Sequence, residues 1–342
     1  MNRKIYFIFL FSLMVFAGKA QIGGESTYQF LELTNSARIA ALGGTQIAIS
    51  DSTDLNLSYN NPSLLHQDMA NKILVNYVNY LTDINYGYVS YAKSYEGLGN
   101  FAVGLHYINY GKFDEATAEG QLTGVTFNAA EYALNLIYSN SYKRLNYGIN
   151  LKPILSSFES YQSIGIAADF GLNLNSKDGN TTVALVARNV GSQITTYYDN
   201  GNRERIPFNL QAGISQRLKH APVVLSLTMQ HLNHWDLATP EEEPEFDIET
   251  IYDRNESFLK QTMRHVVLGV ELMPSDNFVL RAGYNYQRRQ ELMFEEKAST
   301  VGFSAGFGLH IKRFRLDYGI SRFHLAGSSN LFSVAINLNN NF

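Results

Sequence analysis

The sequence lacks cysteine altogether, and charged residues make up only 17% of its 342 positions. Without cysteine we expect no disulfide, no thiolate nucleophile, no iron–sulfur cluster and no lipid-modified cysteine at the N-terminus. The net charge of −4 provides no basic excess for binding nucleic acid. These absences remove several large classes of function before any motif is considered.

Long apolar runs are also missing after the first 20 residues. The N-terminal stretch MNRKIYFIFLFSLMVFAGKAQ combines a basic start, an apolar stretch over residues 5–17 and a small-x-small site at residues 18–20. It predicts a signal peptide over residues 1–20, with a retained anchor helix as the alternative. An exported chain without spanning helices is either soluble or a β-barrel.

A repeated period-two pattern of apolar residues is present instead, as in β-strands that have one apolar face. It predicts strands near residues 72–81, 86–93, 100–110, 131–139, 147–156, 163–173, 181–190, 209–218, 222–232, 265–273, 278–288, 300–311, 314–323 and 331–342. Only residues 31–41 show a helical period.

The lengths of the connections distinguish a membrane barrel from a soluble sandwich. From the fourth strand on, connections after even strands are short, at residues 140–146, 176–181, 219–221, 274–277 and 312–313. Connections after odd strands tend to be long, at residues 111–130, 191–208, 233–264 and 289–299, although residues 82–85 are a short exception. Short turns at one rim and long loops at the other are typical of outer-membrane barrels with periplasmic termini.

We therefore predict an all-β protein, a transmembrane antiparallel up-and-down β-barrel of about 14 strands. The expected division is a signal peptide over residues 1–20, a luminal plug segment over 21–70 and the barrel over 71–342. The last strand should pair with residues 72–81 to close the sheet. Its apolar parity should face lipid, and the terminal aromatic resembles a barrel-assembly signal; these residues are Phe332, Val334, Ile336, Leu338 and Phe342.

Single charges fall on the polar parity of several strands, which would face the lumen. They are Lys152, Asp169, Arg188, Arg217, Glu271 and Arg281. Such groups either pair with one another and with a plug, or line a transport path. The glycines of residues 302–308 share one strand face, which predicts close packing against a plug.

The segment before the first barrel strand carries the most distinctive motif. SARIAALGG at residues 36–44 predicts a short helix of small residues that ends in glycines. A brief strand over residues 46–51 and a turn that opens the barrel, NNPSLL at residues 60–65, should follow. This pattern resembles the PorV/PorQ family of the Bacteroidetes type IX secretion system, outer-membrane barrels related to the FadL fatty-acid transporters. The preceding YQFLEL, residues 28–33, is more similar to PorQ than to PorV.

The resemblance implies a non-enzymatic role in a cell-surface attachment complex. In that family a PorQ-like barrel anchors PorZ, which handles anionic lipopolysaccharide, alongside the sortase-like PorU and the shuttle PorV. The alternative is a FadL-like transporter of hydrophobic small molecules. A transporter needs an apolar pocket that leads from the loops to a lateral or periplasmic exit, whereas an anchor needs a sealed barrel and a protein-binding outer surface.

The longest loop, residues 233–264, is the candidate for partner binding, and a lid over the barrel is the alternative. Its apolar candidates for contact residues are Trp235, Leu237, Phe246, Ile248 and Tyr252. The loop is also acidic over residues 241–247, but it lacks the spacing of a calcium loop. We expect a solvated acidic loop, no metal and no cofactor, with a divalent cation as the open alternative.

Only one motif in the sequence formally suggests an enzyme. Ser90 and Lys93 match the spacing S-x-x-K, but they lie on a predicted strand and no K-T-G partner motif exists. We expect no catalytic residues.

Overall fold

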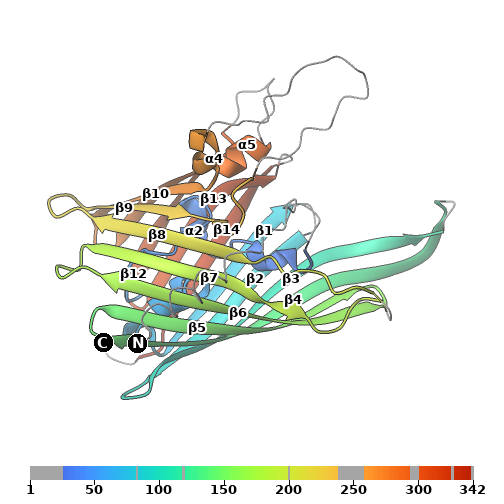
Figure 1. The fold of residues 1–342 in the computed structure, drawn as a ribbon, viewed down its shortest axis with the longest axis horizontal. Coiled ribbons are helices and arrows are strands. Elements are labelled where there is room, and N and C mark those ends of the chain that lie inside the picture. The colour runs from blue at the N-terminus through green and yellow to red at the C-terminus, as the bar shows by residue number, and fades with distance from the viewer. Residues whose placement is uncertain are drawn as a thin grey trace, which may run out of the picture.

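A computed structural model describes residues 26–81, 84–117, 120–198, 201–237, 258–292, 300–324 and 327–339. The described strands form one closed antiparallel barrel in which each strand pairs with its neighbours in sequence (Figure 1). They are β1 (Lys72–Leu81), β2 (Ile84–Tyr95), β3 (Gly99–Ala116), β4 (Leu122–Tyr142), β5 (Leu145–Phe158), β6 (Tyr161–Asn175), β7 (Thr181–Gln193), β8 (Asn209–Arg217), β9 (Val223–Met229), β10 (Val266–Ser275), β11 (Phe278–Asn285), β12 (Phe303–Ile311), β13 (Phe314–His324) and β14 (Gly327–Asn337). The prediction of a barrel of about 14 strands is confirmed.

The two faces of each strand match the period-two pattern. On β13, Leu316 and Ile320 are exposed on the outside, whereas Asp317 is buried on the inside. The same alternation leaves an outer band of leucine, valine, isoleucine and aromatic side chains uncovered on most strands. Such a band is stable only against a nonpolar solvent, so the barrel is a transmembrane one. In the described residues, no helix is both long enough and apolar enough to span a bilayer.

The seam between β1 and β14 closes the sheet with a continuous register from Lys72↔Asn337 to Asn79↔Asn330. Phe332 is 48% exposed and Ser333 only 2%, so the predicted facing of the last strand is confirmed there. The strand ends at Asn337 rather than at residue 342, and Phe342 lies outside the described residues. The role of the terminal residues in assembly stays a prediction.

The connections divide the barrel into two rims. The turn rim carries the short turns after even strands together with the start of β1 and the end of β14; the loop rim is the opposite end. The loop predicted over residues 111–130 is wrong, because β3 and β4 continue through it as a hairpin that projects beyond the loop rim (Figure 1). Stacked rings of Phe113 and Phe127 connect its two strands. The segment looks loop-like in sequence because most of its residues are exposed to water and therefore polar.

The loop rim also carries two short helices, α4 (Phe258–Arg264) and α5 (Tyr286–Leu292), which contact each other. The strand predicted over residues 278–288 is therefore too long, since β11 ends at Asn285 and α5 begins at the next residue. Asn285 accepts a hydrogen bond from the backbone N–H of Arg288, which favours the change to helix at this point.

The plug segment, residues 26–70, lies inside the barrel and is mostly buried. It contains η2 (Gln29–Glu32), α2 (Ala37–Ala41), α3 (Leu57–Asn60), η3 (Pro62–Leu64) and η4 (Gln67–Met69). The predicted short helix is confirmed as α2, with Ser36 as its N-cap, but the helical period over residues 31–41 covers two separate helices.

Two other expectations for the plug segment are wrong. Residues 46–51 form no strand, because a closed barrel leaves no free strand edge with which they could pair. The NNPSLL turn does not open the barrel but lies deep in the lumen, where η3 contacts β5 and β6. Gly148 and Gly171 leave room there for Asn61 and Pro62.

Glycines on the inner face of the C-terminal strands bring α2 against the barrel wall. A Cβ atom at Gly283 would overlap the backbone of Leu42 and Gly43, and one at Gly319 would overlap the carbonyl oxygen of Ala37. Gly306 also lies against Ala41, so the predicted packing against a plug is confirmed for this glycine, whereas Gly302 precedes β12 and Gly308 faces Asp317 and Arg281 of the wall. The small residues of SARIAALGG therefore pack directly against the glycines of β11, β12 and β13.

We predict that Gly283→Ala destabilises the protein while leaving the barrel able to form. The added methyl has no space without a shift of the plug segment, and overpacking of this kind costs about 1–3 kcal/mol. Thermal unfolding of the detergent-solubilised protein measures the loss. Gly327→Ala is the matched control, because a Cβ there meets no atom within 4 Å. Equal melting temperatures for the two variants would contradict the packing argument.

Candidate functional site

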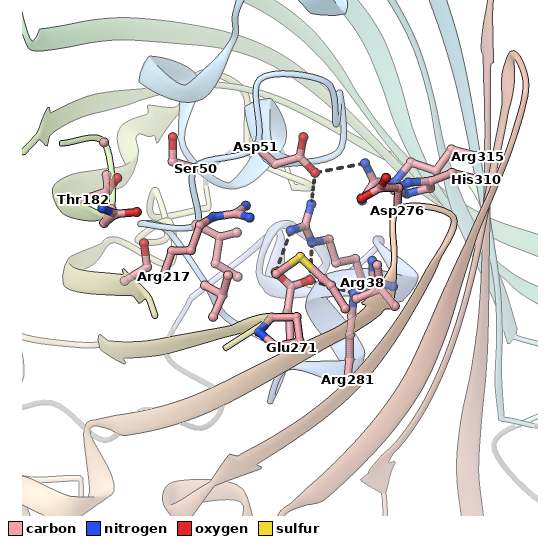
Figure 2. Close-up of a pocket in the computed structure, with 18 of the residues that line it drawn as sticks. Arg38, Ser50, Asp51, Thr182, Arg217, Glu271, Asp276, Arg281, His310 and Arg315 are labelled. Atoms are coloured by element: carbon pink, nitrogen blue, oxygen red, sulfur yellow. Dashed lines mark hydrogen bonds and ion pairs between the residues drawn. The ribbon is translucent and has the colours of Figure 1, made fainter. Parts of the chain in front are cut away.

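Arg38 lies on α2 and extends from the plug segment to the barrel wall (Figure 2). Its guanidinium donates two parallel hydrogen bonds to Glu271 on β10, at 2.8 and 2.7 Å. It also donates to Asp51 and to Asp54 of the plug segment, each at 2.8 Å. One buried cation therefore holds the loop over residues 51–54 and the wall strand β10 together.

Two arginines of the wall extend this arrangement. Arg281 on β11 donates to Glu271 at 2.8 Å and to Asp317 at 2.7 Å. Arg315 on β13 donates to Asp317 and Asp51, each at 3.1 Å, and forms an ion pair with Asp54 at 3.2 Å. We call these seven side chains the Arg38 cluster: Arg38, Asp51, Asp54, Glu271, Arg281, Arg315 and Asp317.

The electrostatics of the cluster favour ionised carboxylates on the plug segment. Burial by itself would raise the pKa of Asp51, but Arg315 and Arg38 outweigh it and hold that pKa well below its ordinary value. The pKa of Asp54 is likewise lowered, because the same two arginines outweigh its complete burial. Three guanidinium groups and four carboxylates leave the cluster with a formal charge of −1, so almost every charge is compensated locally.

A second set of contacts joins the plug segment to the opposite part of the wall. Tyr59 of α3 hydrogen-bonds to His106 on β3, at 2.9 Å, and Lys152 and Arg188 lie over its ring. Lys152 itself pairs with Asp169 at 2.6 Å, and Arg188 donates to the carbonyl oxygen of Leu31 at 3.3 Å. The plug segment is thus bonded to the wall on both sides, through the N-terminal and the C-terminal strands of the barrel.

A cavity of about 300 Å³ opens beside the Arg38 cluster at the turn rim. Its wall includes Asn180, Pro222 and Asp276, which belong to the turns after β6, β8 and β10. Arg217 extends into it from β8 (Figure 2). Charged side chains of the Arg38 cluster line this space together with apolar ones such as Ile49, Val224 and Met273, so its lining is mixed.

Five of the six luminal charges predicted from the sequence take part in the two sets of contacts between the plug segment and the wall. Glu271 and Arg281 belong to the Arg38 cluster, while Lys152, Asp169 and Arg188 lie under α3. Pairing with one another or with the plug is therefore confirmed for these five, and Glu271 and Arg281 line the cavity together with Arg217. Sequence reasoning did not identify Arg38, Asp51, Asp54 or Arg315 as a site. The only signal was the SARIAALGG motif, in which Arg38 is the one large polar residue of α2.

The predicted partner-binding residues fall in two groups. Trp235 is 41% exposed at the loop rim, where its ring stacks on His265 with centroids 4.8 Å apart, whereas Leu237 is only 4% exposed. Phe246, Ile248 and Tyr252 lie outside the described residues, as does the acidic run over residues 241–247. Within the described part of the chain, no group of three His, Asp or Glu side chains has the arrangement of a metal site.

Comparison with known proteins identifies the fold. No protein-family model and no curated protein matches the sequence. The toluene transporter TodX of Pseudomonas putida superimposes with a TM-score of 0.53 at 13% identity, covering 89% of this chain and 96% of that one. The toluene transporter TbuX of Ralstonia pickettii gives a TM-score of 0.52 at 11% identity, covering 90% and 97%. The chain is therefore a 14-stranded membrane barrel with the same fold as these transporters, and at such identities the likeness establishes the fold alone.

We predict that Arg38→Ala strongly destabilises the protein. The substitution leaves Glu271 and Asp54 buried with a missing partner, which typically costs about 3–5 kcal/mol. Arg38→Lys should be intermediate, since it keeps the charge but loses the two parallel bonds. Thermal unfolding in detergent measures both. Arg217→Ala is the control, because this exposed arginine lines the same cavity outside the Arg38 cluster; a loss as large as that of Arg38→Ala would contradict the assignment.

We also predict that stability falls in acid. Asp51 and Asp54 have a lower pKa in the folded protein than in the unfolded chain, so the unfolded chain binds protons first as the pH falls below about 4. Their contribution is present above that pH and is lost progressively below it. Melting temperatures between pH 7 and pH 3 measure the effect. Asp51→Asn should be less stable at pH 7 and show a shallower decline; a parallel decline would count against the carboxylates of the cluster.

Proposed function

We propose that this chain is a non-enzymatic barrel of the Gram-negative outer membrane that anchors a protein partner at the cell surface. The observation that carries the proposal is the plug segment, which is bonded to both sides of the barrel wall. A lumen filled in this way gives a rigid support and offers no apolar route through the described residues. The cavity that opens beside the plug carries buried charges among its apolar side chains, which disfavour it as a path for a hydrocarbon.

The outer membrane is proposed from the distribution of turns and apolar residues. The described turns after even strands are short, whereas the longest connections follow odd strands. This is the pattern of barrels whose turn rim faces the periplasm and whose loop rim faces the outside. The projecting hairpin of β3 and β4 and the helices α4 and α5 would then lie at the cell surface.

The proposed contact surface is an aromatic patch at the loop rim. Trp235 stacks on Phe258, with ring centroids 5.6 Å apart, and Phe258 and Leu259 of α4 are 73% and 69% exposed. Exposed aromatic and aliphatic side chains of this kind are the usual anchors of protein interfaces. Leu237 would support the patch from beneath because it is buried. Phe246, Ile248 and Tyr252 stay candidates from the sequence.

The proposed partner follows from the resemblance of the SARIAALGG segment to the PorV/PorQ family. It is a PorZ-like surface protein within a type IX secretion attachment complex, together with PorU-like and PorV-like components. This role rests on the sequence motif and on the filled lumen.

A second candidate is a FadL-like transporter of hydrophobic small molecules, which the comparisons favour over the attachment role. Two solved toluene transporters share the fold over about nine-tenths of this chain. In this case the plug segment has to move, because it fills the lumen in the present structure. The Arg38 cluster would then oppose opening, since movement of the plug segment breaks the ion pairs of Arg38 with Glu271 and of Arg315 with Asp51 and Asp54.

The two candidates predict different results when the gene is deleted from its host. An anchor predicts that the surface partner is released into the medium; a transporter predicts normal retention and reduced uptake of a hydrophobic solute such as toluene or a fatty acid. Within the first candidate, Trp235→Ala should weaken partner retention by about 2 kcal/mol, roughly thirtyfold in affinity. A pull-down with the purified variant measures this.

Tyr198→Ala is the matched control for that variant. Tyr198 is another exposed aromatic at the loop rim, between β7 and β8, away from α4. Retention that falls equally in both variants would argue against a specific patch at Trp235, and retention unaffected by gene deletion would refute the anchor role altogether.

A further inference from the structure

The outer face of β2, β3 and β4 contains a groove of about 320 Å³. Its side chains on the outside are Tyr91, Lys93, Phe101, Val103, Leu136 and Tyr138. The strand register arranges them in two rows. In the row deeper in the wall, Val103 pairs across the strands with Tyr91 and Leu136. In the row next to the turn rim, Phe101 pairs with Lys93 and Tyr138. The groove is therefore apolar at one end and carries a cation at the other.

The polar end of the groove is built around Asn71, the residue before β1. Its side-chain oxygen accepts hydrogen bonds from Lys93 at 2.9 Å and from Tyr91 at 3.1 Å. Within the described residues, no carboxylate forms an ion pair with Lys93. Glu96 lies three residues further along in the turn after β2. The ammonium group is thus held in position by one neutral oxygen, and its charge is available to an anionic ligand.

The depth of the groove fits the boundary between hydrocarbon and headgroups. Ring contacts join Phe101 to Tyr95 and to Tyr138, with centroids 5.9 and 5.1 Å apart, as in the aromatic girdles of membrane barrels. Lys93 is two residues from the end of β2. A molecule in the groove would have its apolar part beside Val103 and Leu136 and an anionic group beside Lys93.

We propose that this groove binds one phospholipid of the periplasmic leaflet, with an anionic headgroup on Lys93 and an acyl chain along the deeper row. The occupant is a lipid because the groove opens onto the bilayer, where acyl chains are the surrounding solvent. It is a phospholipid of the inner-facing leaflet because the groove lies at the turn rim. The proposal shares only the membrane orientation with the proposed function and needs no surface partner.

Native mass spectrometry of the purified full-length barrel tests this inference. The protein in detergent is titrated with phosphatidylglycerol, phosphatidylcholine or lipid A. Wild type should retain one phosphatidylglycerol in preference to the other two. Lys93→Gln should weaken that binding about fivefold, the contribution of one lysine at an anionic membrane surface. Binding unchanged in this variant, or a preference for lipid A, would overturn the proposal.

Two further variants keep the test decisive. Lys143→Gln is the control for charge, because Lys143 lies at the same rim in the turn between β4 and β5, beside the ring of Tyr142. It should leave lipid binding unchanged. Leu136→Trp fills the deeper row and should abolish retention of both phospholipids, with an unchanged melting temperature showing that the barrel is intact. Retained lipid in that intact variant would place the binding elsewhere.

Discussion

Neutralisation of Arg38 inside the barrel is the interaction on which the interior of this protein depends. A guanidinium group on a short luminal helix is costly unless carboxylates surround it. Here Glu271 comes from the wall and Asp51 and Asp54 from the plug segment, so that Arg38 joins the two parts through ion pairs. Arg315 and Arg281 extend the compensation across the C-terminal strands. The ionic contacts consequently fix the position of the plug segment, and the glycines of the wall allow its backbone to approach.

The same arrangement bears on both functional candidates. A filled and ionically compensated lumen is a stable support for a surface partner, and the exposed patch at Trp235 and α4 gives such a partner aromatic side chains to contact. For a transporter, the Arg38 cluster is the barrier that a substrate or a second protein has to overcome. The likeness to two toluene transporters concerns the architecture of the wall, whereas the difference between the candidates lies in what the plug does.

The barrel itself was predictable because each strand obeys a local rule. Apolar and polar residues alternate wherever one face contacts lipid, and this signal gave all 14 strands. It failed where the environment on the two faces no longer differs. Residues 112–117 and 120–128 are mostly exposed on both sides of a projecting hairpin and resemble a loop in sequence, and the predicted strand at residues 286–288 is the start of α5.

The sequence by itself determined the barrel, its count of strands, the facing of Phe332 and Ser333, and a short helix at SARIAALGG. It also indicated that luminal charges such as Glu271 and Arg281 pair with one another or with a plug. Only the tertiary structure decided which charges meet. Arg38 and Glu271 are separated by more than 200 positions, and no local sequence pattern indicates that they form a bond. A closed barrel brings distant strands around one lumen, so the partners of a plug residue depend on where the whole sheet places them.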